Sequence, residues 1–248
     1  MTIDLSSKVV AVTGASSGIG EATALACAQA GAAVSLAARR ADRIEALAER
    51  ITAAGGRAIA IPTDVGDESQ ARAFVERTHS ELGRLDVLVN NAGVMLLGPI
   101  ENAPTEEWRR MIEANVFGVL YCTHAALGLM REQGSGHIVN VSSVAGRVAR
   151  AGSGVYNLTK FGVGAFSESL RQEGVAIGVR VTTIEPGAVA TELPGHNRPE
   201  VLEQMAKRFV GVTPLSSEDI ANAILYAIGQ PPNVSVNEVL VRPSGQGA

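Results

Sequence analysis

Short apolar runs alternate along this chain with longer segments of helical periodicity, and this alternation limits its fold more than any other feature. The runs are four to six residues long, rich in β-branched residues and typical of strands buried on both faces. Strands that alternate with helices at this rhythm form parallel sheets with right-handed crossovers. We predict strands over Lys8–Thr13, Ala33–Ala38, Ala58–Pro62, Asp86–Asn90, His137–Ser142, Arg180–Glu185 and Glu238–Val241.

Three of the segments between these runs carry helix start signals. Asp42 precedes an apolar i, i+3, i+4 pattern, Thr105 is followed by acids, and Ser216 stands just before two acids. We therefore expect one α/β domain over residues 1–248, a doubly wound Rossmann domain whose seven-stranded parallel sheet has helices on both faces. The predicted helices are Gly18–Ala30, Asp42–Ala54, Glu68–Leu82, Thr105–Arg131, Val155–Gly174 and Ser216–Gly229.

The composition is consistent with one large core and argues against several kinds of partner. Hydrophobic residues make up 46% of the 248 residues, which excludes a disordered chain. The formal net charge is −4 without a long block of like charge, so we expect neither nucleic acid nor membrane as a partner. Cys27 and Cys122 are too few for a disulfide framework or a four-cysteine zinc site. We therefore expect no metal. The sequence has no signal-peptide core and no apolar stretch near 18 residues, so we expect a cytoplasmic protein.

An insertion at about Gly187–Pro214 departs from the strand and helix rhythm. It carries Pro194, Pro199 and Pro214 and surrounds a short helical piece, Glu200–Val210. Long insertions of this kind usually form lids or binding loops, so we expect this segment to cover a substrate.

A glycine-rich segment, TGASSGIG, joins the first predicted strand to the first predicted helix. Glycines there let a turn close and let backbone N–H groups approach a pyrophosphate at the positive end of the helix. A mere tight turn is the alternative, but the position between strand and helix favours a dinucleotide. The predicted contacts are Gly14, Ser16, Ser17, Gly18, Ile19 and Gly20.

The end of the second predicted strand indicates which coenzyme binds. An NAD site places an acid there for the ribose 2′-hydroxyl, whereas an NADP site places a cation near the 2′-phosphate. This chain has Ala38 followed by Arg39 and Arg40, with no acid before Asp42. Two guanidiniums without a carboxylate favour NADP(H), the alternative being that both are solvated surface charges.

Tyr156 and Lys160 lie four residues apart, which places both on one face of a helix. A nearby cation stabilises a phenolate, so we expect the pKa of Tyr156 to fall from about 10 toward neutrality and the phenol to act as a general acid. The spacing alone also occurs by chance in amphipathic helices.

Together these motifs resemble the short-chain dehydrogenase/reductase family over residues 8–245. The matching segments are TGASSGIG, NNAG from Asn90, Asn115 within a long helix, a serine ending the fifth run, YNLTK from Tyr156, and PGAVAT from Pro186. The resemblance implies an NADPH-dependent enzyme that reversibly reduces a ketone or an aldehyde to an alcohol.

The resemblance also implies roles for individual residues. Tyr156 would protonate the carbonyl oxygen, Lys160 would hold the nicotinamide ribose, and Ser143 would orient the substrate. We choose Ser143 over Ser142 because it precedes Tyr156 by thirteen residues, the family's usual separation. Asn115 would hold a water of a proton relay, unless it is only a buried amide. Further coenzyme contacts would be Asp64, Val65, Asn91, Ala92, Gly93, Pro186, Gly187, Val189 and Thr191.

Apolar residues of three segments would form the substrate pocket beside Ser143 and Tyr156. Four segments are similar to clavulanate-dehydrogenase-like and hydroxy-acid dehydrogenase members of the family: VMLLGPIENA, SSVAGRV, FGVGAFSESLRQE and IEPGAVATELPGH. This resemblance implies a carboxylate-bearing aldehyde as an alternative substrate. Arg147, Arg150, His196 and Arg198 would anchor such a carboxylate, unless they are solvated surface groups. The predicted apolar walls are Met95, Leu96, Leu97, Val148, Leu193, Met205 and Phe209.

Two other classes of protein remain to be weighed. A catalytically silent dinucleotide-binding regulator has no need of all four of Asn115, Ser143, Tyr156 and Lys160. A sugar-nucleotide epimerase or dehydratase needs a larger C-terminal domain than the residues after Pro186 provide. Because family members pair their long helices, we also expect a homo-oligomer, a dimer or a tetramer.

Overall fold

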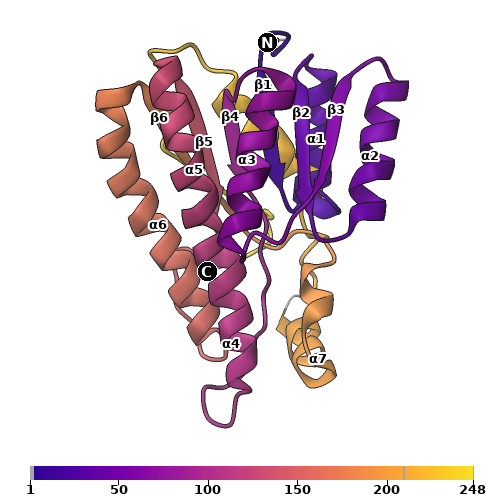
Figure 1. Cartoon of the computed structure of the whole chain (residues 1–248). Helices are drawn as coiled ribbons and strands as arrows, with labels where there is room; N and C mark the ends of the chain where they lie inside the picture. Colours follow the sequence, from indigo (N-terminus) through magenta and orange to yellow (C-terminus); the bar gives the residue numbers. More distant parts are fainter. Residues whose placement is uncertain (1–2, 209, 248) are drawn as a thin grey trace.

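A computed structural model of the chain describes residues 3–208 and 210–247 and contains a seven-stranded parallel sheet (Figure 1). The strand order, β3-β2-β1-β4-β5-β6-β7, is that of a doubly wound fold and confirms the predicted class. Each strand end lies within one residue of its predicted position. The strands are β1 (Val9–Thr13), β2 (Ala33–Ala38), β3 (Arg57–Pro62), β4 (Val87–Asn90), β5 (Gly136–Val141), β6 (Val179–Pro186) and β7 (Glu238–Val241).

Helices cover both faces of the sheet and divide the core into two parts (Figure 1). In β1, Val10 and Val12 enter one part while Ala11 enters the other, as the period of two in a strand requires. One face carries α1 (Gly18–Gln29), α2 (Ala41–Ala53) and α8 (Ser217–Ile228). The other face carries α3 (Glu68–Leu82), α5 (Gly118–Gln133) and α6 (Gly154–Gly174).

The helix starts agree only in part with the predicted signals. Ser216 caps α8 in a capping box with Asp219, as its position before two acids indicated. For α2 the predicted start was wrong, because Arg40 is the N-cap residue and Asp42 lies in the first turn, where its charge favours the helix dipole. The helix predicted from Thr105 does begin at Thr105, with Pro104 rather than Thr105 as its N-cap residue.

The long helix predicted over Thr105–Arg131 is interrupted. It consists of α4 (Thr105–Ile112), a π-helical turn η1 (Glu113–Phe117) and α5, with the Gly118 amide bonded to the Glu113 carbonyl five residues back. By length and composition alone the whole helix, Thr105–Gln133, could cross a membrane, although the core helix of a globular domain has the same character. Here its buried residues Cys122, Ala126 and Met130 pack in the core under the sheet.

The carboxyl ends of the strands meet at one edge, and α4 and the insertion lie beyond it (Figure 1). A bridge between Val189 and Leu215 closes the base of the insertion. Within it are a short 3₁₀ turn, η4 (Leu193–His196), and α7 (Pro199–Arg208), close to the predicted helical piece. In a doubly wound fold this edge is where ligands bind.

Candidate active site

A cavity of about 720 Å³ runs along the carboxyl edge and is lined by all the loops that leave it. Its lining includes nearly every residue that the sequence assigned to a coenzyme; the exception is Gly20, discussed below. The predicted coenzyme residues in the lining are Gly14, Ser16, Ser17, Gly18, Ile19, Arg39, Arg40, Asp64, Val65, Asn91, Ala92, Gly93, Tyr156, Lys160, Pro186, Gly187, Val189 and Thr191.

The glycine loop fits a pyrophosphate because, without side chains, its backbone can come close to a ligand where α1 begins. Gly14 and Gly18 have φ of 67° and 57°, the left-handed conformations that favour glycine. Gly20 lies behind the loop, where a Cβ would collide with the Gly14 carbonyl oxygen. Its contribution is therefore the close packing of α1 against the turn, not direct contact with the cavity.

Thr13 and Asn91 hold this loop to the neighbouring strand end. The Thr13 hydroxyl accepts hydrogen bonds from the Asn91 and Ala92 amides, each 3.0 Å long, and the Asn91 side chain donates to the Thr13 carbonyl at 2.9 Å. At the next loop, the Asp64 carboxylate accepts the Gly66 amide at 3.0 Å. These bonds fix the backbone that a dinucleotide would follow.

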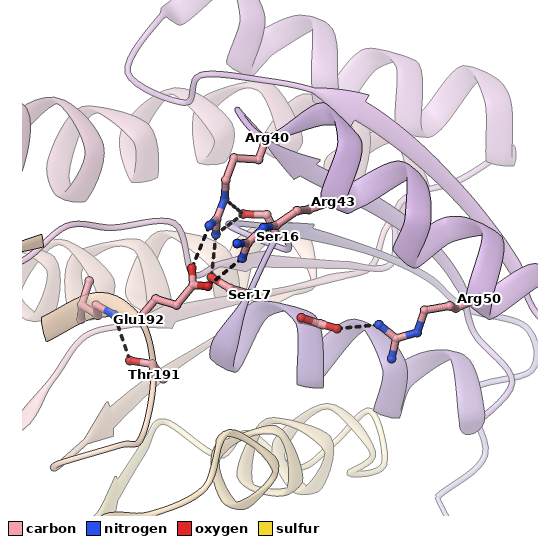
Figure 2. A network of polar contacts seen from close by, with 9 residues as sticks. Ser16, Ser17, Arg40, Arg43, Arg50, Thr191 and Glu192 are labelled. Carbon is pink, nitrogen blue, oxygen red and sulfur yellow. Dashed lines mark hydrogen bonds and ion pairs between the residues drawn. The ribbon is translucent and has the colours of Figure 1, made fainter. Parts of the chain in front are cut away.

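The outer end of the cavity carries a network of charged and hydroxyl groups (Figure 2). The Arg40 guanidinium donates to Ser16 Oγ at 2.9 Å and to Ser17 Oγ at 2.8 Å. Its Nη1 lies 2.8 Å from the Glu192 carboxylate, which also binds Arg43 at 2.7 Å. Arg39 lines the cavity but is exposed. The sequence argument missed Arg43 and Glu192, because nothing in the sequence places the insertion beside α2.

The inner end holds Tyr156 and Lys160, one turn apart on α6. Lys160 Nζ donates to the Val141 carbonyl at 2.9 Å and lies 5.9 Å from the centre of the Tyr156 ring. The Ser143 hydroxyl accepts the Ala145 amide at 3.1 Å, donates to the Pro186 carbonyl at 3.4 Å and lies beside the Tyr156 phenol, whose pKa it lowers. Ser142 instead donates to the Lys160 carbonyl at 3.1 Å. Of the two serines, Ser143 is the one beside the phenol.

Burial sets the protonation of Tyr156 and Lys160. The predicted fall in the pKa of Tyr156 was wrong, because burial raises that pKa. Burial raises the pKa of Tyr156 to about 12, against a smaller lowering by the hydrogen bond from Ser143. Burial also lowers the pKa of Lys160 to about 8. Desolvation disfavours both charged forms and outweighs the attraction that would have lowered the tyrosine pKa. Tyr156 is therefore a neutral phenol near pH 7 and carries the proton that a general acid needs.

Asn115 lies in the π-helical turn and outside the cavity lining. Its side chain accepts the Val94 amide at 2.8 Å and donates to the Val94 carbonyl at 2.9 Å and to Thr159 Oγ1 at 3.2 Å. The amide group thus ties the loop after β4 to α6, which agrees with the alternative of a satisfied buried amide. Its place in a water relay stays a prediction.

Most of the predicted apolar walls line the cavity. Leu96 is the exception, since it is buried in a small core cluster with Met111; Phe209 lies outside the described residues. Met95 and Leu97 pack against the cluster that contains Tyr156. The predicted walls that line the cavity are Met95, Leu97, Val148, Leu193 and Met205.

Two asparagines that the sequence argument missed hold these walls. Asn197 accepts the Leu97 amide at 2.7 Å and donates to the Met95 carbonyl at 3.0 Å, joining the insertion to the loop after β4. Asn157 donates to the Ala145 and Val148 carbonyls at 2.7 and 3.1 Å. Asn157 stands next to Tyr156 in the motif, whereas no signal marked Asn197.

The four cationic candidates separate into two pairs. Arg147 is bound to Glu185 and Glu238, and Arg198 lies 3.6 Å from both Glu107 and Glu200; neither lines the cavity. Arg150 and His196 do line it. Burial, with nearby arginines, lowers the pKa of His196, so Arg150 is the charged group of this pair near pH 7. Across the described residues, no group of three or more metal-ligating side chains occurs.

Comparisons with known proteins agree with this geometry. The profile of the short chain dehydrogenase family matches residues 8–201. An uncharacterised oxidoreductase of Staphylococcus saprophyticus is 43% identical over 96% of this chain and 97% of its own. Serine dehydrogenase in a closed form complexed with NADP+ is similar in structure, with a TM-score of 0.90, 33% identity and coverage of 97% of this chain and 96% of its own. An alcohol dehydrogenase of Thermococcus sibiricus complexed with 5-hydroxy-NADP gives a TM-score of 0.87, 30% identity and coverage of 97% and 98%.

Proposed function

The chain belongs to the short chain dehydrogenase family of oxidoreductases, and on that premise we propose that it is an NADP(H)-dependent reductase converting a ketone or an aldehyde reversibly to an alcohol. The observation that carries the proposal is the single cavity that joins the glycine loop and Arg40 at one end to Ser143, Tyr156 and Lys160 at the other. A silent dinucleotide-binding regulator would not need the inner group.

The coenzyme would lie along the carboxyl edge. Gly14 and the first turn of α1 would hold the pyrophosphate, Arg40 the 2′-phosphate and Lys160 the nicotinamide ribose. When bound, the coenzyme supplies the hydride that the carbonyl carbon receives. Structural neighbours are complexed with NADP+, with 5-hydroxy-NADP and, in one case, with NADH, so the choice of NADP(H) over NAD(H) rests on Arg40 and on the absence of an acid at Ala38.

Side chains of the protein would orient and protonate the carbonyl oxygen of the substrate. Ser143 would donate a hydrogen bond that orients the substrate, and neutral Tyr156 would give its proton to the oxygen as negative charge develops there. Lys160, protonated below pH 8, would stabilise the resulting phenolate. Met95 and Leu193 would exclude water from this end, while Asn115 would help return a proton to the site.

A carboxylate-bearing carbonyl compound is the second candidate substrate, and Arg150 is the observation that favours it. Arg150 lines the cavity in the loop just before α6, and its backbone amide donates to the side chain of Asn157, which follows Tyr156. Substrate turnover should settle which class is used: NADPH absorbance is followed with aldehydes, ketones and keto acids. If a keto acid is preferred, Arg150→Met should raise its KM about tenfold or more while leaving a neutral ketone unaffected.

We also propose a single catalytic domain acting in the cytoplasm as a homo-oligomer. The argument for assembly is that Phe117, Leu158 and Phe161 are exposed on the long helices. Light scattering coupled to gel filtration should give a mass at least twice that of the chain; a monomer at micromolar concentration would contradict it.

A further inference from the structure

At the outer end of the cavity, Glu192 binds Arg40 and Arg43, which lie far from it in the sequence (Figure 2). One carboxylate oxygen lies 2.8 Å from Arg40 Nη1 and the other 2.7 Å from Arg43 Nη1. Arg40 and Arg43 follow β2, whereas Glu192 lies within the insertion and is the N-cap residue of η4. The two ion pairs therefore tie the insertion to the end of the cavity formed by the glycine loop and the residues after β2.

The guanidinium of Arg40 is held in an orientation that suits an anion. Arg40 is oriented by the hydroxyls of Ser16 and Ser17, both of the glycine loop. A guanidinium fixed in this way binds a carboxylate or a phosphate with the same geometry. Pairing with both arginines holds the pKa of the Glu192 carboxyl well below its usual range, at about 2, so the bridging group is an anion throughout the working range of pH.

We propose that Glu192 occupies the place of the coenzyme's 2′-phosphate, and that a phosphate arriving there displaces the carboxylate and releases the start of the insertion. The inference rests on the proposed use of NADP(H). It makes Arg43 a second phosphate ligand beside Arg40, and it makes Glu192 a competitor that NADPH must replace and that NADH leaves in place.

The released segment includes part of the substrate pocket. Leu193 directly follows Glu192 and lines the cavity, and Asn197 after η4 holds the loop of Met95 and Leu97. The wall of the substrate pocket would therefore be free to rearrange only when a coenzyme with a 2′-phosphate has displaced Glu192. Both ion pairs are partly exposed, and such pairs are weak, so we expect a modest coupling.

Hydrogen exchange with two nucleotide fragments tests the release without catalysis. Adenosine 2′,5′-bisphosphate and 5′-AMP differ only in the 2′-phosphate, and neither carries nicotinamide. On the full chain, the bisphosphate should speed exchange of amides in residues 192–198, while 5′-AMP should not. Unchanged or slower exchange in that segment with the bisphosphate bound would overturn the proposal.

Titration calorimetry of Glu192→Gln tests the competition separately. The variant should bind the bisphosphate about three- to tenfold more tightly than the wild type, bind 5′-AMP equally well, and exchange faster over residues 192–198 without any ligand. Glu203→Gln makes the same charge change on α7 but removes only a pair with Lys207, so it should behave as the wild type. Unchanged or weaker binding of the bisphosphate to Glu192→Gln would overturn the competition, and would point instead to a carboxylate that assists binding.

The two proposals fail in different ways. If the wild type bound both fragments equally, the NADP(H) assignment and the displacement would both be wrong. If it preferred the bisphosphate but Glu192→Gln gained nothing, only the displacement would be wrong.

Discussion

The two ends of the cavity hold their charged groups by opposite physical means. At the inner end, Tyr156 and Lys160 are 6% and 7% exposed, and their partners are Ser143 and a backbone carbonyl. At the outer end, the side chains of Arg40 and Glu192 are 41% and 47% exposed and pair with each other. Desolvation therefore governs protonation at the inner end, whereas charge pairing governs the outer end.

This difference separates the conditions to which each end responds. Buried groups with shifted pKa values respond to pH and are little screened by salt. Exposed ion pairs respond to salt and contribute little individually. We expect rate to depend mainly on the inner end and coenzyme choice mainly on the outer end, and the following changes test that division.

The largest effect should come from removing the phenol at the inner end. Tyr156→Phe deletes the proton donor and leaves the outer end intact, so kcat for carbonyl reduction should fall about 10²- to 10⁴-fold while the Kd of NADPH stays within about threefold. Stopped-flow turnover and fluorescence titration measure the two quantities. Tyr226→Phe removes an exposed phenol of α8 and should leave both unchanged. A kcat within tenfold of the wild type would exclude Tyr156 as the acid.

The sequence predicts the fold well because burial on both faces of a parallel sheet leaves a direct pattern. Each strand was located to within one residue, since its apolar run ends where the chain leaves the sheet. The π-helical turn at Glu113–Phe117 could not be predicted, because a single extra residue in a helix does not alter the apolar period detectably. The start of α2 was misplaced because Asp42 is favourable both as a cap and in a first turn.

The candidate site was predictable where a residue's partner lies in the same motif. Tyr156 and Lys160 meet because one helix carries both, and the glycine loop needs only its own strand and helix. Contacts across the fold were not predictable: Glu192 with Arg43, and Asn197 with Leu97, join segments about a hundred residues or more apart. The pKa of Tyr156 was expected to fall because spacing reveals the neighbouring cation but not the extent of burial.

The next largest effect concerns the buried amine and the pH dependence of stability. In the coenzyme-free protein the pKa of Lys160 is about 8, against 10.5 for the exposed amine. Between these pH values the unfolded chain binds more protons, so the free energy of unfolding should rise with pH. The shift corresponds to a rise on the order of 3 kcal/mol from pH 8 to 10.5, relative to a Lys160→Met variant. Denaturant titrations at several pH values measure it. Parallel pH profiles for the two proteins would mean that Lys160 is not desolvated as the structure has it.

A smaller effect should follow from exchanging the charges at the outer end. Ala38→Asp combined with Arg40→Gln supplies an acceptor for a ribose 2′-hydroxyl, repels a 2′-phosphate and removes its anchor. The ratio of kcat/KM for NADPH to that for NADH should fall about ten- to a hundredfold, with kcat nearly unchanged. Arg50→Gln is the matched control, because Arg50, labelled in Figure 2, pairs with Glu21 and neither residue lines the cavity. A double variant with the preference of the wild type would make Arg40 a surface charge only.

The smallest effect is the one that salt should produce, and it compares both ends in a single experiment. Raising NaCl from about 0.05 to 0.5 M shortens the Debye length from roughly 14 to 4 Å, which weakens contacts between exposed arginines and a phosphate. Salt also weakens the pairs of Glu192 with Arg40 and Arg43, which partly offsets the loss, so the KM for NADPH should rise only about two- to fivefold. The KM for NADH should change less, since it carries no 2′-phosphate, and kcat should stay constant because Tyr156 and Lys160 are buried. A kcat that fell with salt in step with the NADPH affinity would contradict the division, because screening would then reach the inner end as well.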